Sequence, residues 1–272
     1  IGERFTVFVL LYGPYTTLAR RCLDGILDTT SADQIDLRVG ANCVCPETKE
    51  YLDSIRRRIQ KVYWQEDPAE AVKYPLMRQM FRDPELPVDT SYLIWFDDDS
   101  YVHHPDWMLA LADNINKNHL LGYRIYGPTI ARQVVFKEGT SSMYYPPRGD
   151  GEVRALENRK KEVAWMRRAE WHHGRPLRTR SGYPSAEKGD SVIFVAGSFW
   201  ALATHLIKDA DIPDRRLRHL GGDITISEQV YQAGFKPLSF NKLKTFVKYS
   251  AAARRGDPRY PQQYAWLEET RA

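Results

Sequence analysis

The sequence predicts an α/β protein, with a mainly parallel central sheet, helices on both sides and a smaller mixed region in the second half. Two observations indicate this class. Apolar, strand-length runs alternate with segments of helical spacing through residues 4–116, which is typical of a parallel sheet. One such run leads directly into Asp97, Asp98 and Asp99. Ligands of such sheets bind beyond the carboxyl ends of the strands, where these aspartates would lie.

The first strand and helix follow from local pattern. Arg4–Tyr12 is rich in β-forming apolar residues, and Gly13 and Pro14 end it. Thr16–Leu27 places its apolar residues at helical spacing, which predicts a helix, and Ile35–Ala41 is the second apolar strand.

The next elements repeat this alternation. Glu47–Gln60 has a helical pattern that ends in a charged run, and Lys61–Trp64 is a short third strand. Tyr74–Phe81 is a short helix, and Tyr92–Phe96 is the apolar strand before the aspartates. Pro105 begins a helix that reaches about Asn116, since proline suits the first helical turn.

The second half is less regular. Residues from Phe136 to Asp190 are polar, charged and rich in glycine and proline. Around this insertion the predicted strands are Gly122–Ile130, Val192–Leu202 and Lys236–Phe240, and the predicted helices are Thr204–Ala210 and Asp223–Gln232.

Composition excludes some classes of protein. Hydrophobic residues make up 43% and charged residues 27% of the 272 residues, as in ordinary soluble domains. No run approaches the roughly 18 to 20 apolar residues of a membrane span. Cys22, Cys43 and Cys45 form neither a disulfide framework nor a zinc-ligand spacing. The formal charge of +4 is too small to establish a nucleic-acid partner.

Three adjacent carboxylates repel one another unless a cation joins them. Mg²⁺ and Mn²⁺ prefer carboxylate oxygens and also bind diphosphates, so the triplet predicts a metal–diphosphate site. A solvated acidic turn, with Asp99 capping the next helix, is the alternative.

The run WFDDDSYV resembles the Asp-X-Asp motif of GT-A glycosyltransferases, and is most similar to the Fringe-type pattern. Five further segments follow the family's order: LLYGPY, VGANC, KYPLMRQMF, VAGSFWAL and GGDITISEQV. The resemblance implies a single GT-A domain over residues 1–272. Its nucleotide-sugar-binding half would span about 1–121, and its acceptor and catalytic half about 122–272, with a basic insertion at about 136–190.

The resemblance also implies a role for each matching residue. The donor would be a nucleotide sugar, expected to be a UDP-sugar such as UDP-glucose, with Mn²⁺ or Mg²⁺. Asp97 would contact the nucleotide and the metal, Asp98 would be a neighbouring ligand and Asp99 the principal metal ligand. Tyr12 and Asn42 would line the base pocket. Lys73 and Arg78 would hold the nucleotide or the motif carboxylates, with surface cations as the alternative.

Asp223 is the expected catalytic base, because inverting transfer needs a group that takes the proton of the acceptor hydroxyl. It follows two glycines at a predicted helix start. A helix N-terminus favours the ionised carboxylate, so this role is compatible with the alternative, a simple N-cap.

The C-terminal region departs from the family. Many GT-A enzymes use a histidine there as a metal ligand, but no histidine lies beyond His219. Arg254 and Arg255 are expected to face the diphosphate instead, as cationic side chains bind phosphate oxygens. A solvated basic tail is the alternative. The missing histidine puts the metal requirement in question.

Residues 148–180 contain ten Lys or Arg and five Asp or Glu, with Trp165 and Trp171 interleaved. This mixture favours DNA as the acceptor partner, because basic residues bind phosphates and aromatic rings stack on bases. The chain also resembles phage-associated glycosyltransferases that modify 5-hydroxymethylated bases. A cytoplasmic location, in the host if the gene is a phage's, and no protein or membrane partner are expected. The alternatives are a glycan or protein hydroxyl acceptor, or a non-catalytic nucleic-acid-binding module.

Overall fold

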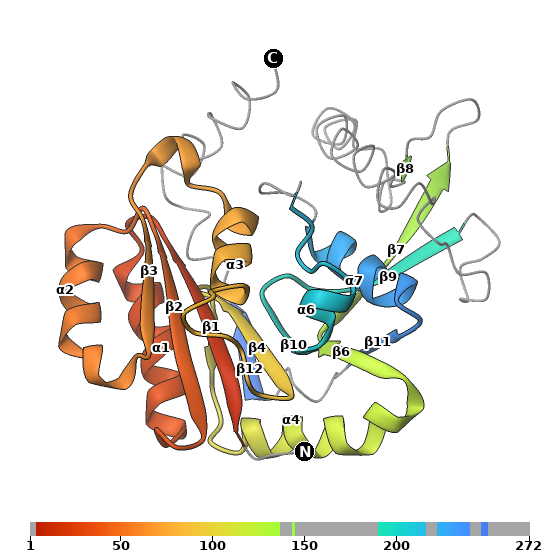
Figure 1. Ribbon diagram of the computed structural model, residues 1–272, viewed down its shortest axis with the longest axis horizontal. Helices are drawn as coiled ribbons and strands as arrows, with labels where there is room; N and C mark the ends of the chain where they lie inside the picture. Colours follow the sequence, from red (N-terminus) through yellow and green to blue (C-terminus); the bar gives the residue numbers. More distant parts are fainter. Residues whose placement is uncertain (1–3, 137–142, 145–189, 216–221, 240–245, 250–272) are drawn as a thin grey trace, which may run out of the picture.

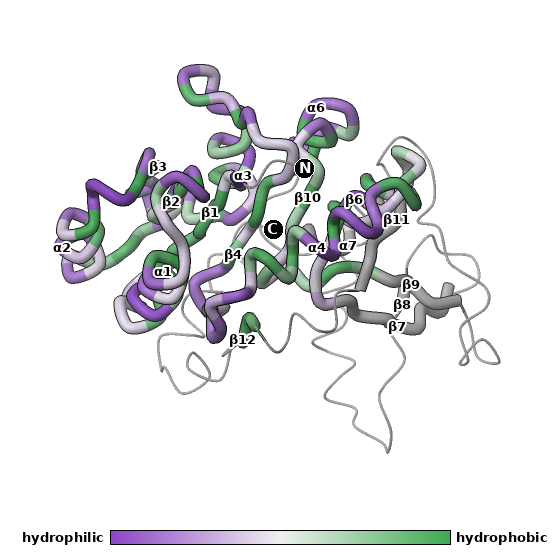
Figure 2. The backbone as a smooth tube through the Cα atoms, turned by 90° about the horizontal axis from the view of Figure 1, so that it is seen from below, coloured by the Kyte–Doolittle hydropathy of each residue, from purple (hydrophilic) through white to green (hydrophobic). Residues whose placement is uncertain are grey.

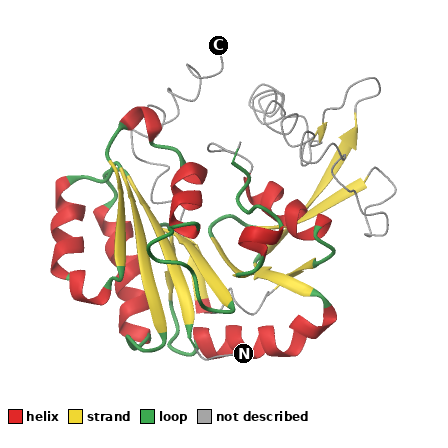
Figure 3. Cartoon of the chain, in the orientation of Figure 1, coloured by secondary structure: helices red, strands yellow, loops and turns green. Residues whose placement is uncertain are grey.

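The computed structural model describes residues 4–136, 143–144, 190–215, 222–239 and 246–249. The first half alternates strands and helices as predicted (Figures 1 and 3). Its elements are β1 (Phe5–Tyr12), α1 (Thr16–Thr29), β2 (Ile35–Asn42), α2 (Pro46–Ser54), η1 (Arg56–Arg58), β3 (Lys61–Gln65), η2 (Pro68–Glu70), α3 (Lys73–Phe81), β4 (Tyr92–Asp97), β5 (Ser100–Val102) and α4 (Trp107–Asn118).

The second half adds shorter elements, which lie on the other side of β4 except for β12, the partner of β5 (Figure 1). They are η3 (His119–Leu121), β6 (Tyr123–Gly127), β7 (Thr129–Phe136), β8 (Met143–Tyr144), β9 (Asp190–Val195), β10 (Phe199–Ala203), α6 (Leu206–Asp209), α7 (Gly222–Gln232), β11 (Lys236–Ser239) and β12 (Val247–Tyr249).

A seven-stranded sheet of order β11-β6-β10-β4-β1-β2-β3 forms the centre. Strands β4, β1, β2 and β3 are parallel, and β11 is parallel to β6. Strand β10 runs antiparallel to both of its neighbours, β4 and β6. The predicted class, a mainly parallel sheet in an α/β chain, is confirmed.

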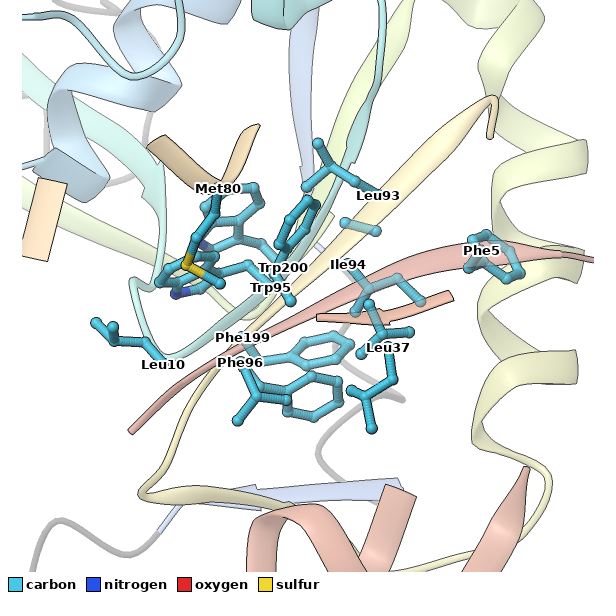
Figure 4. Packing of buried hydrophobic residues seen from close by; sticks show 14 of the residues in the cluster. Phe5, Leu10, Leu37, Met80, Leu93, Ile94, Trp95, Phe96, Phe199 and Trp200 are labelled. Carbon is cyan, nitrogen blue, oxygen red and sulfur yellow. The ribbon is translucent and has the colours of Figure 1, made fainter. Parts of the chain in front are cut away.

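Helices cover both faces of this sheet. Successive side chains of β4 point to opposite faces, and each face packs against a helix. Trp95 packs against Phe81 of α3, with ring centroids 5.8 Å apart. Phe96 packs against Trp107 of α4 at 5.5 Å. Figure 4 shows Trp95 beside Trp200 on one side of the strand and Phe96 beside Phe199 on the other. In Figure 2 the hydrophobic strands β4 and β10 lie at the centre.

The predicted helix Glu47–Gln60 is wrong in its second half. Helix α2 ends at Ser54, and the arginine run forms the short 3-10 helix η1. Arg58 donates to the carbonyls of Leu27 and Thr30 at the end of α1. These bonds satisfy acceptors that the last turn of α1 leaves open, which favours the turn over further helix.

Two predicted strands, Gly122–Ile130 and Val192–Leu202, are each two strands. Pro128 separates β6 from β7, since proline has no N–H for the ladder. A turn at residues 196–198 separates β9 from β10. Strand β9 pairs with β7 in a second sheet, whereas β10 pairs with β4 in the main sheet. This turn therefore lies beside the end of β4.

The loop between α3 and β4 is tied to the sheet by buried ionic groups. Arg38 of β2 binds Asp36 and donates to the carbonyls of Leu86 and Pro87. The Asp83 carboxylate accepts from Lys61 at 2.6 Å, from the Tyr63 hydroxyl at 2.8 Å and from the Glu85 N–H at 3.0 Å. Although burial alone raises the pKa of Asp83, these bonds lower the pKa to about 2.

We expect Asp83→Asn to destabilise the fold most at neutral pH, with about half of that effect left at pH 3, between the folded and unfolded pKa values. A carboxyl whose pKa is lowered on folding adds stability above its unfolded pKa of about 3.9, and that stability disappears as the pH falls toward the folded value. Denaturant unfolding of the wild type and the variant at pH 7, 4 and 3 measures this, with exposed Asp89→Asn as the matched control. A difference that stays constant from pH 7 to 3 would contradict the assignment.

Candidate active site at the end of β4

The backbone of the aspartate triplet is fixed by two neighbouring segments. The Asp97 N–H donates to the Ser198 carbonyl at 2.9 Å, and the Asp98 N–H donates to the Leu10 carbonyl at 3.1 Å. The Ser100 hydroxyl also donates to Ser198 at 2.9 Å. The turn before β10 and the end of β1 therefore both hold the motif, as expected for the carboxyl edge of a parallel sheet.

The Asp97 carboxylate is bonded on both oxygens. The Trp95 indole N–H donates to Oδ1 at 2.9 Å, and Lys73 Nζ lies 2.7 Å from Oδ2. Lys73 also donates to the Gly197 carbonyl at 3.2 Å. The side chain of Lys73 is 13% exposed and that of Asp97 is 22% exposed. This partly buried ion pair joins the start of α3 to the end of β4.

Asp98 faces β1. Its Oδ2 accepts from the Tyr12 N–H at 3.0 Å, and Gly13 turns the chain in the left-handed region (φ +59°) before α1. Tyr12 lies directly opposite Asn42 in the β1–β2 register. The Asn42 amide is fully buried, and neither of its polar atoms has a hydrogen-bond partner among the described residues. The structure thus brings Tyr12, Asn42 and the motif together.

The negative charge of the triplet extends into the core below it. Burial raises the pKa of the Cys22 thiol well above its usual value, and Asp98, Asp99 and Asp97 raise the pKa further. Asp98 and Asp99 are themselves buried. Cys22 is fully buried, and the field at this edge favours positive groups such as Lys73.

Asp223 lies next to this cluster, at the start of α7. Gly197 lies between Asp223 and Lys73: a Cβ added at Gly197 would be 3.3 Å from Asp223 Cβ and 3.6 Å from Lys73 Nζ. Buried Ser227 of α7 accepts from the Val195 N–H at 3.0 Å, which fixes the helix against β9. Two segments that the sequence separates by about 125 residues, the motif and the GGD segment, thus meet at Gly197.

Arg78 lies elsewhere. It donates to the Pro213 carbonyl at 2.7 Å and binds Asp211, which Arg82 also binds. Five residues separate Arg78 from Lys73, or about 140° around a helix, so the two side chains leave α3 in different directions. Among the described contacts Arg78 has none with the motif carboxylates; it anchors α3 to the segment before α7.

The described part of the chain is predicted from its sequence to hold a metal ion at the aspartate triplet. No group of three or more His, Cys, Asp or Glu side chains there could hold a metal ion. Asp97 in particular suits its ion pair with Lys73 rather than a metal, because an ammonium 2.7 Å from the carboxylate repels a second cation. The role of Asp99 in metal binding stays a prediction.

The described chain returns beside the motif near its C-terminal end. Strand β12 pairs antiparallel with β5, with Tyr249 opposite Ser100 and Lys248 opposite Tyr101. Arg254 and Arg255 lie outside the described residues, as does the basic segment Arg148–Arg180. No described helix has the length and apolar character that crossing a membrane requires.

Sequence reasoning missed two members of the site. Trp95 was interpreted only as part of a buried strand, although an indole N–H two residues before Asp97 lies on the same face. The role of Gly197 as the point where Lys73 and Asp223 meet has no signal beyond a glycine at a strand boundary.

Neither a family model nor a curated protein matches the sequence, but solved structures share its fold. S. aureus TarS 1–349 in complex with UDP-GlcNAc has a TM-score of 0.50 at 13% identity, and the match covers 90% of this chain and 57% of that chain. S. aureus TarS has a TM-score of 0.50 at 13% identity, and that match covers 98% of this chain and 42% of that chain.

The Pyrobaculum calidifontis mannosyltransferase PcManGT, in complex with GDP-Man and Mn²⁺, has a TM-score of 0.48 at 10% identity, and the match covers 88% of this chain and 55% of that chain. The chain spans about half the length of the solved proteins that it resembles. Such a likeness shows the fold alone, and the chain has the GT-A fold that its sequence predicts.

Proposed function

We propose that the chain is a glycosyltransferase that moves a sugar from a nucleotide-sugar donor to a hydroxyl group. The observation that carries this proposal is the meeting of the motif aspartate Asp97, its cation Lys73 and the separate carboxylate Asp223 around Gly197. Transfer needs groups for the donor and a base for the acceptor within reach of one another.

UDP-sugars are the proposed donors. The fold is shared with TarS, which was solved with UDP-GlcNAc. Tyr12 and Asn42, adjacent at the ends of β1 and β2, are the proposed base pocket. A buried amide with both a donor and an acceptor unsatisfied is costly, and the polar edge of uracil offers a partner for each after local rearrangement.

Asp223 is the proposed base of an inverting displacement. The acceptor oxygen attacks the anomeric carbon and gives its proton to the Asp223 carboxylate. The bond between the anomeric carbon and the diphosphate oxygen breaks, and its electron pair leaves with the diphosphate. The position of Asp223 in the first turn of α7 supports this role, because the helix N-terminus stabilises the ionised carboxylate.

DNA that carries 5-hydroxymethylated pyrimidines is the proposed acceptor. The support comes from sequence: an excess of five positive charges over residues 148–180, with tryptophans interleaved. Phosphate contacts and base stacking are the two interactions that such a segment offers. An enzyme must also flip a base out of the duplex to reach its hydroxymethyl group.

A panel of UDP-sugars tests both halves of the proposal. Each donor is incubated with hydroxymethylated and unmodified DNA, with Mn²⁺ or with EDTA, and the nucleosides are analysed by mass spectrometry. We expect a hexose adduct on hydroxymethylated DNA alone. Hydrolysis of a donor without any DNA product would move the search to glycan and protein acceptors. If neither transfer nor hydrolysis occurs with any nucleotide sugar, the proposal that the chain is a glycosyltransferase is refuted.

A further inference from the structure

We propose that Lys73 binds the diphosphate of the donor directly. Its ammonium then provides the positive charge that a metal ion bound to Asp97 would otherwise provide. This inference rests on the proposed function, and it makes nucleotide binding independent of a divalent cation at Asp97.

Lys73 is held in place but is not saturated. Its ammonium donates to Asp97 at 2.7 Å and to the Gly197 carbonyl at 3.2 Å. An ammonium has three N–H donors. Two of them are used by these acceptors in the described part of the chain, so the third can bind a ligand. Arg78 of α3 and Arg82, which follows the helix, both bind Asp211. The cation is therefore oriented before any ligand arrives.

Asp97 has little left to offer a metal. The Trp95 indole bonds one carboxylate oxygen at 2.9 Å and Lys73 the other. The pair is close to neutral, and an added cation would meet the ammonium as well as the carboxylate. An anion gains from the same arrangement, since Lys73 is also the first residue of α3, where the helix dipole favours negative charge.

The position of Lys73 suits the leaving group. Gly197 has no side chain, and the space that its Cβ would fill lies 3.6 Å from Lys73 Nζ and 3.7 Å from Asp223 Cγ. The ammonium and the carboxylate therefore both lie beside Gly197. The base serves the attacking oxygen, and negative charge develops on the opposite side of the anomeric carbon, on the diphosphate. Charge-assisted bonds to phosphate oxygens are short and strong.

Titration calorimetry in EDTA isolates the contact, because it needs no sugar transfer. UDP and uridine are each titrated into the wild type, Lys73→Met, Lys73→Met with Asp97→Asn, and Lys117→Met. Lys117 is an exposed lysine of α4 and provides a matched control. We expect Lys73→Met to bind UDP at least tenfold more weakly and uridine unchanged, and Lys117→Met to match the wild type for both ligands.

The double variant shows whether Lys73 contacts the diphosphate or only neutralises the charge of Asp97. If Lys73 only cancels the charge of Asp97, then removing both charges restores the affinity for UDP, and the proposal is overturned. If Lys73 touches the diphosphate, the double variant stays weak. Wild-type UDP binding that vanishes in EDTA and returns with Mn²⁺ also overturns it, while the proposed transferase stands. Failure of every nucleoside diphosphate to bind overturns the proposed function, and this inference with it.

Discussion

Asp223→Asn should lower the rate of sugar transfer by about two to four orders of magnitude, the usual contribution of a general base. Asparagine keeps the size of the side chain and its ability to accept a hydrogen bond, but it cannot take the acceptor proton. Affinity for UDP should change little, because the donor contacts that we propose lie across Gly197 on β1, β2 and α3. Initial rates at saturating donor and acceptor measure the loss.

Asp209→Asn, an exposed aspartate on α6, is the matched control and should transfer sugar at the wild-type rate. A loss of less than tenfold in Asp223→Asn would leave this residue with a role only at the start of α7. The configuration of the product gives a second test by NMR. Because direct attack inverts the anomeric carbon, a retained configuration would rule out this mechanism.

Gly197→Ala should reduce transfer by about tenfold while the protein stays folded. The new methyl group would lie 3.3 Å from Asp223 Cβ, so Asp223 must shift slightly, whereas the 3.6 Å to Lys73 Nζ is an ordinary contact distance. A displacement of about 1 Å in a reacting group can cost 100-fold, so a shift of a few tenths of an ångström in Asp223 should cost about tenfold.

Three measurements together decide the Gly197 prediction: the rate of transfer, the affinity for UDP and the thermal unfolding midpoint. We expect only the first to change strongly. A variant that transfers sugar normally would show that the space beside Gly197 is not used. A low rate combined with a large drop in the unfolding midpoint would indicate damage to the β9–β10 turn instead.

The sequence was informative where structure follows from local pattern. The alternation of strands and helices and the position of Asp97 at a strand end could be read directly, because both depend on neighbouring residues. The division of Val192–Leu202 could not, since both halves are apolar and only their pairing partners in two different sheets separate them.

The candidate site shows the same limit. Its members were individually identified by resemblance, but their partners were not. Lys73 reaches Asp97 whereas Arg78 reaches Asp211, and both lie on one short helix in a basic segment. Which cation faces the motif depends on how α3 sits on the sheet, and that is set by packing of Phe81 against Trp95 and Phe8.

The place of β10 has a consequence for how the chain folds. Strand β4, which carries the motif, pairs with β1 on one side and with β10 on the other. Until synthesis reaches Ala203, one edge of β4 has no partner, and the Asp97 N–H lacks its acceptor on Ser198. Contacts so distant in sequence slow folding, and open strand edges promote aggregation. The first 121 residues alone should therefore expose this edge, and we expect nucleotide binding only after β10 has docked.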